Sequence, residues 1–396
     1  MKKTLTLLLV LLVVNLFGQT KVVELTDCLK EHSKHPKEYV LNLFKTHDIV
    51  IIGERDHRDT TQYDLLLEII GDQRFIENVG HVYTEVGCTN KTGRANRILK
   101  STYENDSLFE EKLIELYRNL DFNPLWEKYN LYKYLKGIYA INKNLRYDNR
   151  ITIGFTDLAF DWEGMDRKKY AAFEKKMNAQ SQTRDSIMAA NFMRLYANQI
   201  AQTGKRKALL IQSFPHAINL NLTPLGGKYR TTGNYIVEEY GEQVKIVAFN
   251  KLNYGSYNSD NYSLINKGRW DAAFEKTNCT PIGFDILDQP FGKTTYGRYR
   301  GSEIKYEELV DGILFYTPFY NFKRVVGIPN VVDKSFSNEL MRRTIISQEK
   351  FINRLGLRII KPFYKKKNAR YYSNVRTLQF KEDNEMLVEQ MKQWME

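Results

Sequence analysis

The most constraining feature of this chain is the run DIVIIG at 48–53, in which Asp48 is followed by a continuous apolar stretch that is rich in β-branched residues and free of polar alternation. This pattern is typical of a strand that is buried on both faces of a sheet. Similar short runs lie at 81–86, 150–155, 208–212, 244–249, 281–286 and 312–316. Helical patterns separate many of these runs, which favours parallel pairing. We therefore expect an α/β fold, a mostly parallel central sheet with helices on both faces.

The helical patterns also predict how the chain is divided. Apolar residues with helical spacing mark a helix from about 63 to 70 and a long helix from about 165 to 202. The stretch from about 90 to 145 is helical without a strand pattern, so we expect a helical insertion that caps the site. Residues 19–329 would form one α/β domain, and residues 330–396 a basic helical extension.

The N-terminal residues 1–18 have the pattern of a secretory signal peptide. Lys2 and Lys3 precede an apolar run at 5–17, and the small residue Gly18 follows it. The run is shorter than the roughly 20 apolar residues that span a bilayer, although an uncleaved anchor is the alternative. We expect an exported protein, periplasmic or secreted.

Composition excludes several classes of protein. Aromatic residues make up 13% of the chain, too many for a chain that is mainly disordered. The three cysteines, Cys28, Cys88 and Cys279, are too few for a disulfide framework, and they leave open one disulfide plus a thiol or three thiols. The net charge is +12, and KPFYKKK at 361–367 is basic with aromatic residues. For an exported chain this segment favours an anionic envelope surface or solvation, and no nucleic acid as partner.

Polar side chains follow the predicted strands where these strands end. Glu54 and His57 come after the first strand, Glu85 ends the second, Asp157 follows the third and His216 follows the fourth. Because ligands of open α/β sheets bind at the carboxyl ends of the strands, Glu54, His57, Glu85 and His216 are expected to converge there. A buried carboxylate needs such partners.

Converging Glu and His residues suit general acid–base chemistry. A histidine that a carboxylate orients can take a proton from water near neutral pH, because its ordinary pKa is close. The alternatives are that Glu54 caps a helix, that His57 is a surface residue, and that His216 is structural. Such a cluster could also hold a divalent metal, although the spacing does not require one. The chain contains no Gly-x-Ser-x-Gly elbow, phosphate loop or Cys-x-x-Cys pair.

The motifs together resemble the erythromycin esterase family. The resemblance begins with GERDH at 53–57 and the second glutamate Glu85. It continues through RDSIMAAN at 184–191, TGNYI at 232–236, WDAAF at 270–274 and DGI at 311–313, and covers about 48–318. The related Tiki/ChaN-like superfamily has a first motif of a similar kind.

This resemblance implies hydrolysis of an ester or related carbonyl bond in a small-molecule substrate, without a metal or another cofactor. His57 would be the general base, with Glu54 and Glu85 as its carboxylate partners and His216 at the opposite side of the carbonyl. The chain departs from the family at SFPH, 213–216, which keeps only the last residue of a His-Asn-x-His segment. A haem- or metal-binding uptake protein of the Tiki/ChaN kind and a non-catalytic homologue are the competing readings. Arg184 either faces this site or forms a structural ion pair.

Overall fold

The computed structural model describes residues 21–32, 34–179, 183–222, 229–254, 262–297, 303–348, 371–378 and 381–395. The predicted signal peptide and the basic segment 361–367 lie outside these residues. Two compact units make up the chain. Unit 1 comprises Met1–Leu43, Lys245–Phe322 and Gln379–Glu396, and unit 2 comprises Phe44–Val244 and Lys323–Leu378. None of the described helices is long and apolar enough to cross a membrane.

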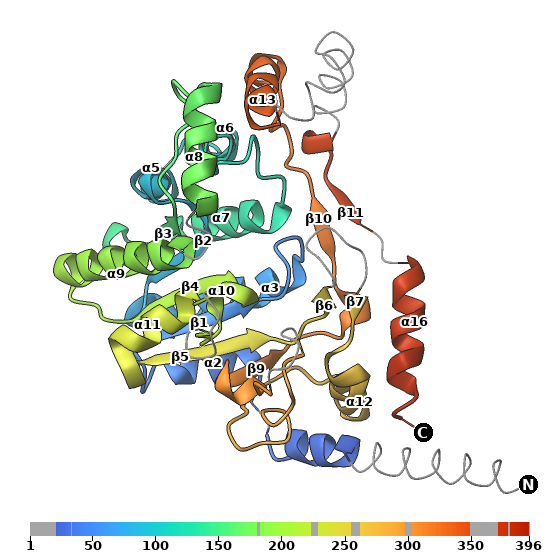
Figure 1. Ribbon diagram of the computed structural model, residues 1–396. Helices are drawn as coiled ribbons and strands as arrows, with labels where there is room; N and C mark the ends of the chain where they lie inside the picture. The colour runs from blue at the N-terminus through green and yellow to red at the C-terminus, as the bar shows by residue number, and fades with distance from the viewer. Residues whose placement is uncertain are drawn as a thin grey trace, which may run out of the picture. The chain divides into compact units, whose positions relative to one another are not determined.

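Seven strands form a mostly parallel sheet in the order β3-β2-β4-β1-β5-β9-β8, which confirms the predicted α/β class (Figure 1). Their bounds are β1 (Ile49–Glu54), β2 (His81–Cys88), β3 (Thr152–Asp157), β4 (Ala208–Ser213), β5 (Val244–Phe249), β8 (Ile282–Asp285) and β9 (Gly312–Phe315). All six residues of β1 are buried, as the sequence pattern predicts. Strand β8 departs from the parallel pattern because it pairs antiparallel with β9.

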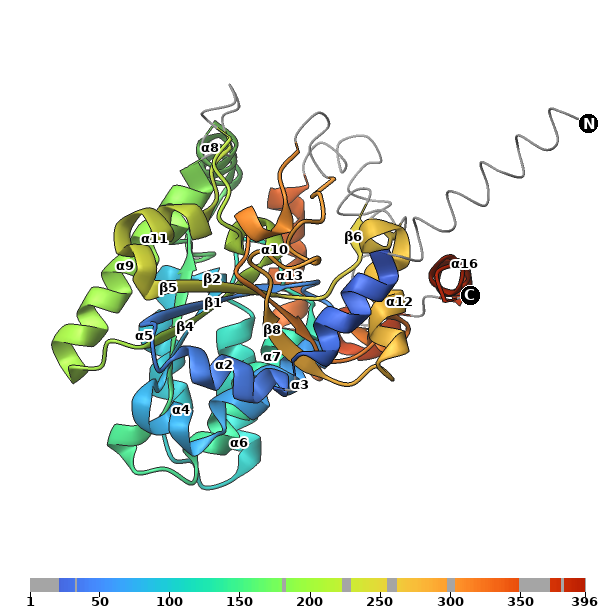
Figure 2. The same cartoon turned by 90° about the horizontal axis from the view of Figure 1, so that it is seen from below.

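Unit 2 contains the four parallel strands β3, β2, β4 and β1, of which β1 and β4 pair from Ile49↔Ala208 to Glu54↔Ser213. Its helices are α3 (Thr61–Ile70), α4 (Gln73–Asn78), α5 (Thr92–Leu99), α6 (Asp106–Tyr117), α7 (Tyr129–Asn142), α8 (Arg167–Ala179), α9 (Thr183–Thr203), α10 (Phe214–Ala217), α11 (Thr232–Tyr240) and α13 (Lys334–Ser347). Helices α5, α6 and α7 occupy the predicted insertion between β2 and β3, where the described chain 89–151 forms no strand. Helices α9 and α11 lie side by side in both views (Figures 1 and 2).

The single long helix predicted from 165 to 202 is wrong, because the structure has two helices there. Helix α8 ends at Ala179 and α9 begins at Thr183. The two helices bury different faces. Tyr170 of α8 belongs to an aromatic cluster with Phe160 and Trp162, whereas the apolar stripe of α9 packs on β3. The helical spacing of apolar residues alone could not distinguish one long helix from two helices that pack against separate surfaces.

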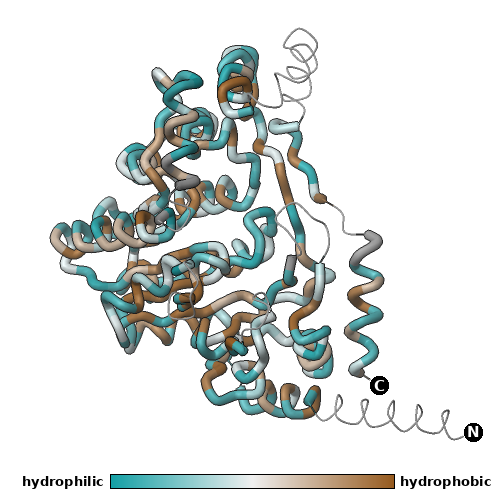
Figure 3. The backbone as a smooth tube through the Cα atoms, viewed as in Figure 1, coloured by the Kyte–Doolittle hydropathy of each residue, from teal (hydrophilic) through white to brown (hydrophobic). Residues whose placement is uncertain are grey.

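The described residues after 330 do not form a unit of their own. In unit 2, β10 (Arg324–Val326) pairs antiparallel with β11 (Arg376–Leu378), and α13 packs on α8. In unit 1, α16 (Lys381–Lys392) packs beside α12 (Arg269–Lys276). Apolar and polar segments alternate along α16, and its Leu387 and Met391 are buried (Figure 3).

The rest of unit 1 surrounds β5, β9 and β8. It includes α2 (Pro36–Leu43), which packs on β8, and the short antiparallel pair β6 (Asn253–Tyr254) and β7 (Tyr262–Ser263). The cysteines of both units are free thiols. Cys28 and Cys88 are buried and Cys279 is half-buried, so the structure has three thiols and not a disulfide.

Candidate active site

The four predicted site residues come together at the carboxyl ends of three neighbouring strands of unit 2. Glu54 is the last residue of β1, and His57 follows it by three residues. Glu85 lies in β2, and His216 lies in the short helix α10 that begins directly after β4. The pairing of β2 with β3 shifts register just beyond Thr84, where β2 carries Glu85 into the site.

A glycine makes this register shift sterically possible. Gly87 has φ +117, a conformation that side chains other than glycine rarely adopt. A Cβ atom at Gly87 would lie 2.5 Å from the ring of Phe155. The local path of β2 beyond Glu85 therefore depends on glycine at this position.

His57 lies between two carboxylates. Its Nδ1 is 3.1 Å from Oε2 of Glu54, and its Nε2 is 3.7 Å from Oε1 of Glu85. The Nδ1 contact is an ion pair without the alignment of a hydrogen bond. The His57 ring also meets the Trp126 ring edge to face, with centroids 5.3 Å apart. Because Trp126 precedes α7, the predicted insertion contributes one side of the histidine's surroundings.

Polar side chains from two helices surround the other oxygen of Glu54. Gln62 of α3 and Asn130 of α7 place their amide nitrogens 3.5 and 3.4 Å from Oε1. Burial and then the neighbouring Glu54 carboxylate raise the pKa of the Tyr63 phenol well above its ordinary value. Glu54 is therefore a buried carboxylate partner of His57. Its contacts are not those of a helix-capping residue, which was the alternative that the sequence left open.

His216 has a carboxylate partner that the sequence did not assign. Its Nδ1 is hydrogen-bonded to Oδ1 of Asp185 at 2.8 Å, and its Nε2 lies 3.6 Å from Oε1 of Glu85. Asp185 in turn accepts hydrogen bonds from the backbone N–H and the hydroxyl of Thr232, both at 2.8 Å. The signal that could have found Asp185 is its place in RDSIMAAN, one turn before the apolar stripe of α9.

Arg184 combines the two roles that the sequence left open. It binds Asp157 through two hydrogen bonds of 3.1 and 2.8 Å, which is a structural ion pair. The same guanidinium lies 3.5 Å from Oε1 of Glu85 and 3.5 Å from Nε2 of His216. Asp157 at the end of β3 therefore orients an arginine toward the site.

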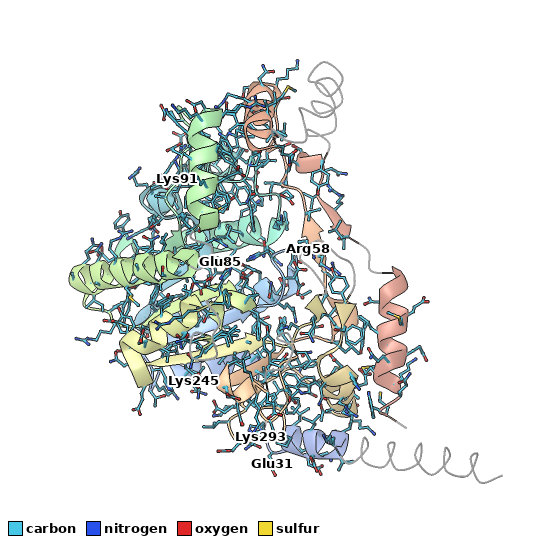
Figure 4. All side chains as sticks on the ribbon, viewed as in Figure 1. Glu31, Arg58, Glu85, Lys91, Lys245 and Lys293 are labelled. Carbon is cyan, nitrogen blue, oxygen red and sulfur yellow. The ribbon has the colours of Figure 1, made fainter. Side chains whose placement is uncertain are left out.

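Glu85 is the centre of the cluster, and it lies beside the end of α9 that carries Arg184 (Figure 4). Its Oε1 faces His57, His216 and Arg184 at 3.7, 3.6 and 3.5 Å. Its Oε2 accepts hydrogen bonds from the backbone N–H and hydroxyl of Ser213 at 2.8 and 2.7 Å. One carboxylate is thus shared by three cationic groups while its other oxygen is fixed by the end of β4.

The electrostatics follow from this arrangement. Burial by itself raises the pKa of Glu85, but the cationic His216, His57 and Arg184 together hold that pKa well below its usual range. Burial acts to lower the pKa of His57, and Glu54 and Glu85 outweigh it and raise that pKa well above 6.5. The pKa of His216 is also raised, by Glu85 and Asp185 against burial and Arg184. The site therefore favours the protonated form of both imidazoles, whereas an ordinary histidine pKa was expected from the sequence.

The geometry gives two histidine–carboxylate pairs with their Nε2 atoms directed to one place. The side chains of His57 and His216 are 11% and 18% exposed, whereas that of Glu85 is 4% exposed. The two imidazoles and Arg184, which is 25% exposed, are therefore more accessible than the carboxylate that they share. In the described part of the chain, no three His, Cys, Asp or Glu side chains are placed to hold a metal ion. This arrangement suits proton transfer and the binding of a polarised oxygen.

No family model and no curated protein matches this chain. Solved structures that are similar include a Bacillus cereus protein, at 13% identity and TM-score 0.45, with 74% of this chain and 96% of that chain covered. A mutant of the erythromycin esterase EreC in its open conformation is similar at 12% identity and TM-score 0.37, covering 70% and 92%. ChaN of Campylobacter jejuni with cofacially bound heme is similar at 12% identity and TM-score 0.32, covering 56% and 87%. The chain thus has distant structural similarity to an erythromycin esterase and to ChaN.

Proposed function

We propose that this protein is a hydrolase that cleaves an ester or a related carbonyl compound with water, with His57 as the general base. The observation that carries the proposal is the convergence of two histidine–carboxylate pairs, His57–Glu54 and His216–Asp185, on one oxygen of Glu85. Glu54 and Asp185 each contact an Nδ1 atom, and both Nε2 atoms lie 3.7 and 3.6 Å from Oε1 of Glu85, so a substrate would bind beside that oxygen. One imidazole can then accept a proton from water while the other donates a hydrogen bond to the carbonyl oxygen of the same substrate.

In this mechanism His57 accepts a proton from the attacking water at Nε2, while Glu54 steadies the imidazolium that forms. The carbonyl oxygen gains negative charge as the water oxygen bonds to the carbonyl carbon. Nε2–H of His216 and the guanidinium of Arg184 are the donors available to that oxygen. The tetrahedral intermediate then collapses, and the proton held by His57 passes to the leaving oxygen.

The raised pKa of His57 has a consequence for this mechanism. Only the neutral imidazole can accept a proton, and the carboxylates Glu54 and Glu85 raise the pKa of His57 well above 6.5 against the effect of burial. The rate should therefore increase as the pH rises from 6.5 toward the raised pKa of His57, and should fall again where His216 loses the proton that makes Nε2–H a donor. A profile that is already flat from pH 6.5 would contradict His57 as the base.

The test is hydrolysis of a panel of chromogenic esters and macrolides by the wild type and by His57→Asn. We expect His57→Asn to lose on the order of a hundredfold or more in kcat/KM, as expected for removal of a general base. His47→Asn is the matched control, because His47 precedes β1 at the opposite end of the strand from the site. Equal, slow turnover by all three proteins would refute the proposal.

A haem- or metal-binding uptake protein is the competing outcome of the same experiment. Metal analysis and an absorption spectrum of the purified chain would reveal it. A stoichiometric metal or a haem band that disappears in His57→Asn, together with no ester turnover, would replace the hydrolase proposal.

A further inference from the structure

Unit 2 contains a cavity of about 640 Å³ that includes none of the residues of the candidate active site. Its wall combines α5 and α6, the residues after α6, the segment after β3, and α13. The charged wall residues are the arginines Arg94, Arg118, Arg342 and Arg343 and the glutamates Glu115, Glu163 and Glu339. This volume is within the roughly 300–1,000 Å³ of small-molecule sites. We propose that the cavity binds a small hydroxylated ligand that carries one oxyanion group, a carboxylate or a phosphate.

Two consecutive arginines of α13 share one carboxylate. Glu339 accepts hydrogen bonds from Arg342 through both of its oxygens, each at 2.7 Å, and from Arg343 at 2.7 Å. The side chain of Arg343 is only 4% exposed. Glu339 alone does not neutralise these two guanidinium groups, although the wall as a whole is balanced once Glu163 and the Asp333 partner of Arg118 are counted. An oxyanion placed beside Arg342 and Arg343 would complete the pairing of these two guanidinium groups.

The guanidinium groups are also held in place before any ligand arrives. Arg343 donates to the side-chain oxygen of Asn119 at 2.8 Å, and Arg342 donates to the carbonyl of Trp162 at 2.9 Å. The face of the Arg343 guanidinium lies 5.0 Å from the ring centroid of Phe336 and 5.2 Å from that of Trp162. Ordering these long side chains in advance reduces the entropy lost on binding. Guanidinium groups also match the geometry of carboxylate and phosphate oxygens.

The other charged residues of the wall limit the ligand to one anionic group. Arg118 is paired with Asp333 at 2.7 Å, and Arg94 lies 3.2 Å from Glu115. These pairs add little net charge to the wall. Glu163 also lines the cavity, where it disfavours a second anion and can accept hydrogen bonds from hydroxyl groups. A sugar acid or a sugar phosphate has this chemistry.

The test is calorimetric titration of the full chain at low ionic strength with inorganic phosphate and with gluconate. We expect both to bind, gluconate more tightly because its hydroxyls add contacts. Arg342→Gln should weaken binding about tenfold, the loss of one charge-assisted hydrogen bond, and Arg94→Gln should weaken it less, because Arg94 is paired with Glu115. Arg74→Gln is the control, because Arg74 is an exposed arginine of α4 paired with Asp72 outside the cavity.

Two results would overturn the proposal. Absence of binding at millimolar probe concentration by the wild type is the first. Equal affinity in Arg74→Gln, Arg94→Gln and Arg342→Gln is the second, because it would identify nonspecific attraction to a basic surface. Arg94 is partly exposed, so Arg94→Gln keeps the test valid even where loss of the Arg342 contacts to Trp162 and Met165 unfolds the protein. None of these readouts depends on ester hydrolysis.

Discussion

Replacement of Glu85 by glutamine tests the electrostatic description of the site most directly. The variant keeps an oxygen that can accept the hydrogen bonds of Ser213 but removes the negative charge that faces His57, His216 and Arg184. Unit charges about 4 Å apart attract by about 4 kcal/mol at an effective dielectric constant of 20. Part of this attraction offsets the desolvation of Glu85, and loss of one partner of a buried pair costs about 3–5 kcal/mol. We expect Glu85→Gln to lower the free energy of unfolding by that amount.

The direction of each pKa shift predicts how the decrease in unfolding free energy caused by Glu85→Gln depends on pH. The pKa of Glu85 is depressed in the folded state, so its stabilisation is present above pH 4.5 and lost as the pH falls further. The pKa values of His57 and His216 are raised, so their stabilisation is complete below pH 6.5 and lost as the pH rises through the raised values. The difference between wild type and Glu85→Gln should therefore be largest between pH 4.5 and 6.5.

Urea unfolding at pH 5.5, 7 and 8.5, followed by circular dichroism, measures this difference. Glu77→Gln is the control, because Glu77 is an exposed residue of α4 that contacts only Gln73 among the described hydrogen bonds. A loss below about 1 kcal/mol, the range of exposed ion pairs, would refute the description of Glu85 as the shared partner of three cations. A loss that grows with rising pH would refute the raised histidine pKa values.

Two further predictions concern the supports of His216. Asp185→Asn should lower kcat/KM on the esters about tenfold or more while Thr232 keeps its contacts, and unchanged kcat/KM would show that Asp185 does not orient His216. Gly233→Ala should destabilise the protein by about 1–3 kcal/mol, because its Cβ would lie 1.9 Å from the Ala217 carbonyl oxygen of α10. Gly93→Ala on α5, which meets only Arg97 at 3.7 Å, should not destabilise it, and equal urea midpoints for both variants would contradict this packing.

The sequence predicted the strands and the edge at which the site lies because both depend on short local patterns. An apolar run of β-branched residues with a polar residue at its end predicted β1 and Glu54 together. The convergence of Glu54, His57, Glu85 and His216 then followed from parallel pairing, which brings strand ends together. The strands thus follow from local patterns, and the convergence needs in addition only the general rule of parallel pairing.

Features that depend on distant packing were not predictable in this way. Asp185 contacts His216 and Thr232 across 31 and 47 residues, and nothing in the sequence indicates which carboxylate reaches which histidine. The edge contact of Trp126 with His57 depends on how the insertion folds back. The raised pKa values of both imidazoles depend on charges contributed by several elements, so the ordinary pKa of histidine was a poor guide.

The fixing of Glu85 and Asp185 has a consequence for how the site can vary. Each carboxylate is held by a main-chain N–H group, that of Ser213 or that of Thr232, in addition to a hydroxyl. A peptide N–H is present at either position whatever non-proline residue stands there. The backbone of β4 and α11 therefore fixes the orientation of both carboxylates. Side chains near the candidate site can then be substituted, and can change which ligands it accepts, without moving Glu85 or Asp185.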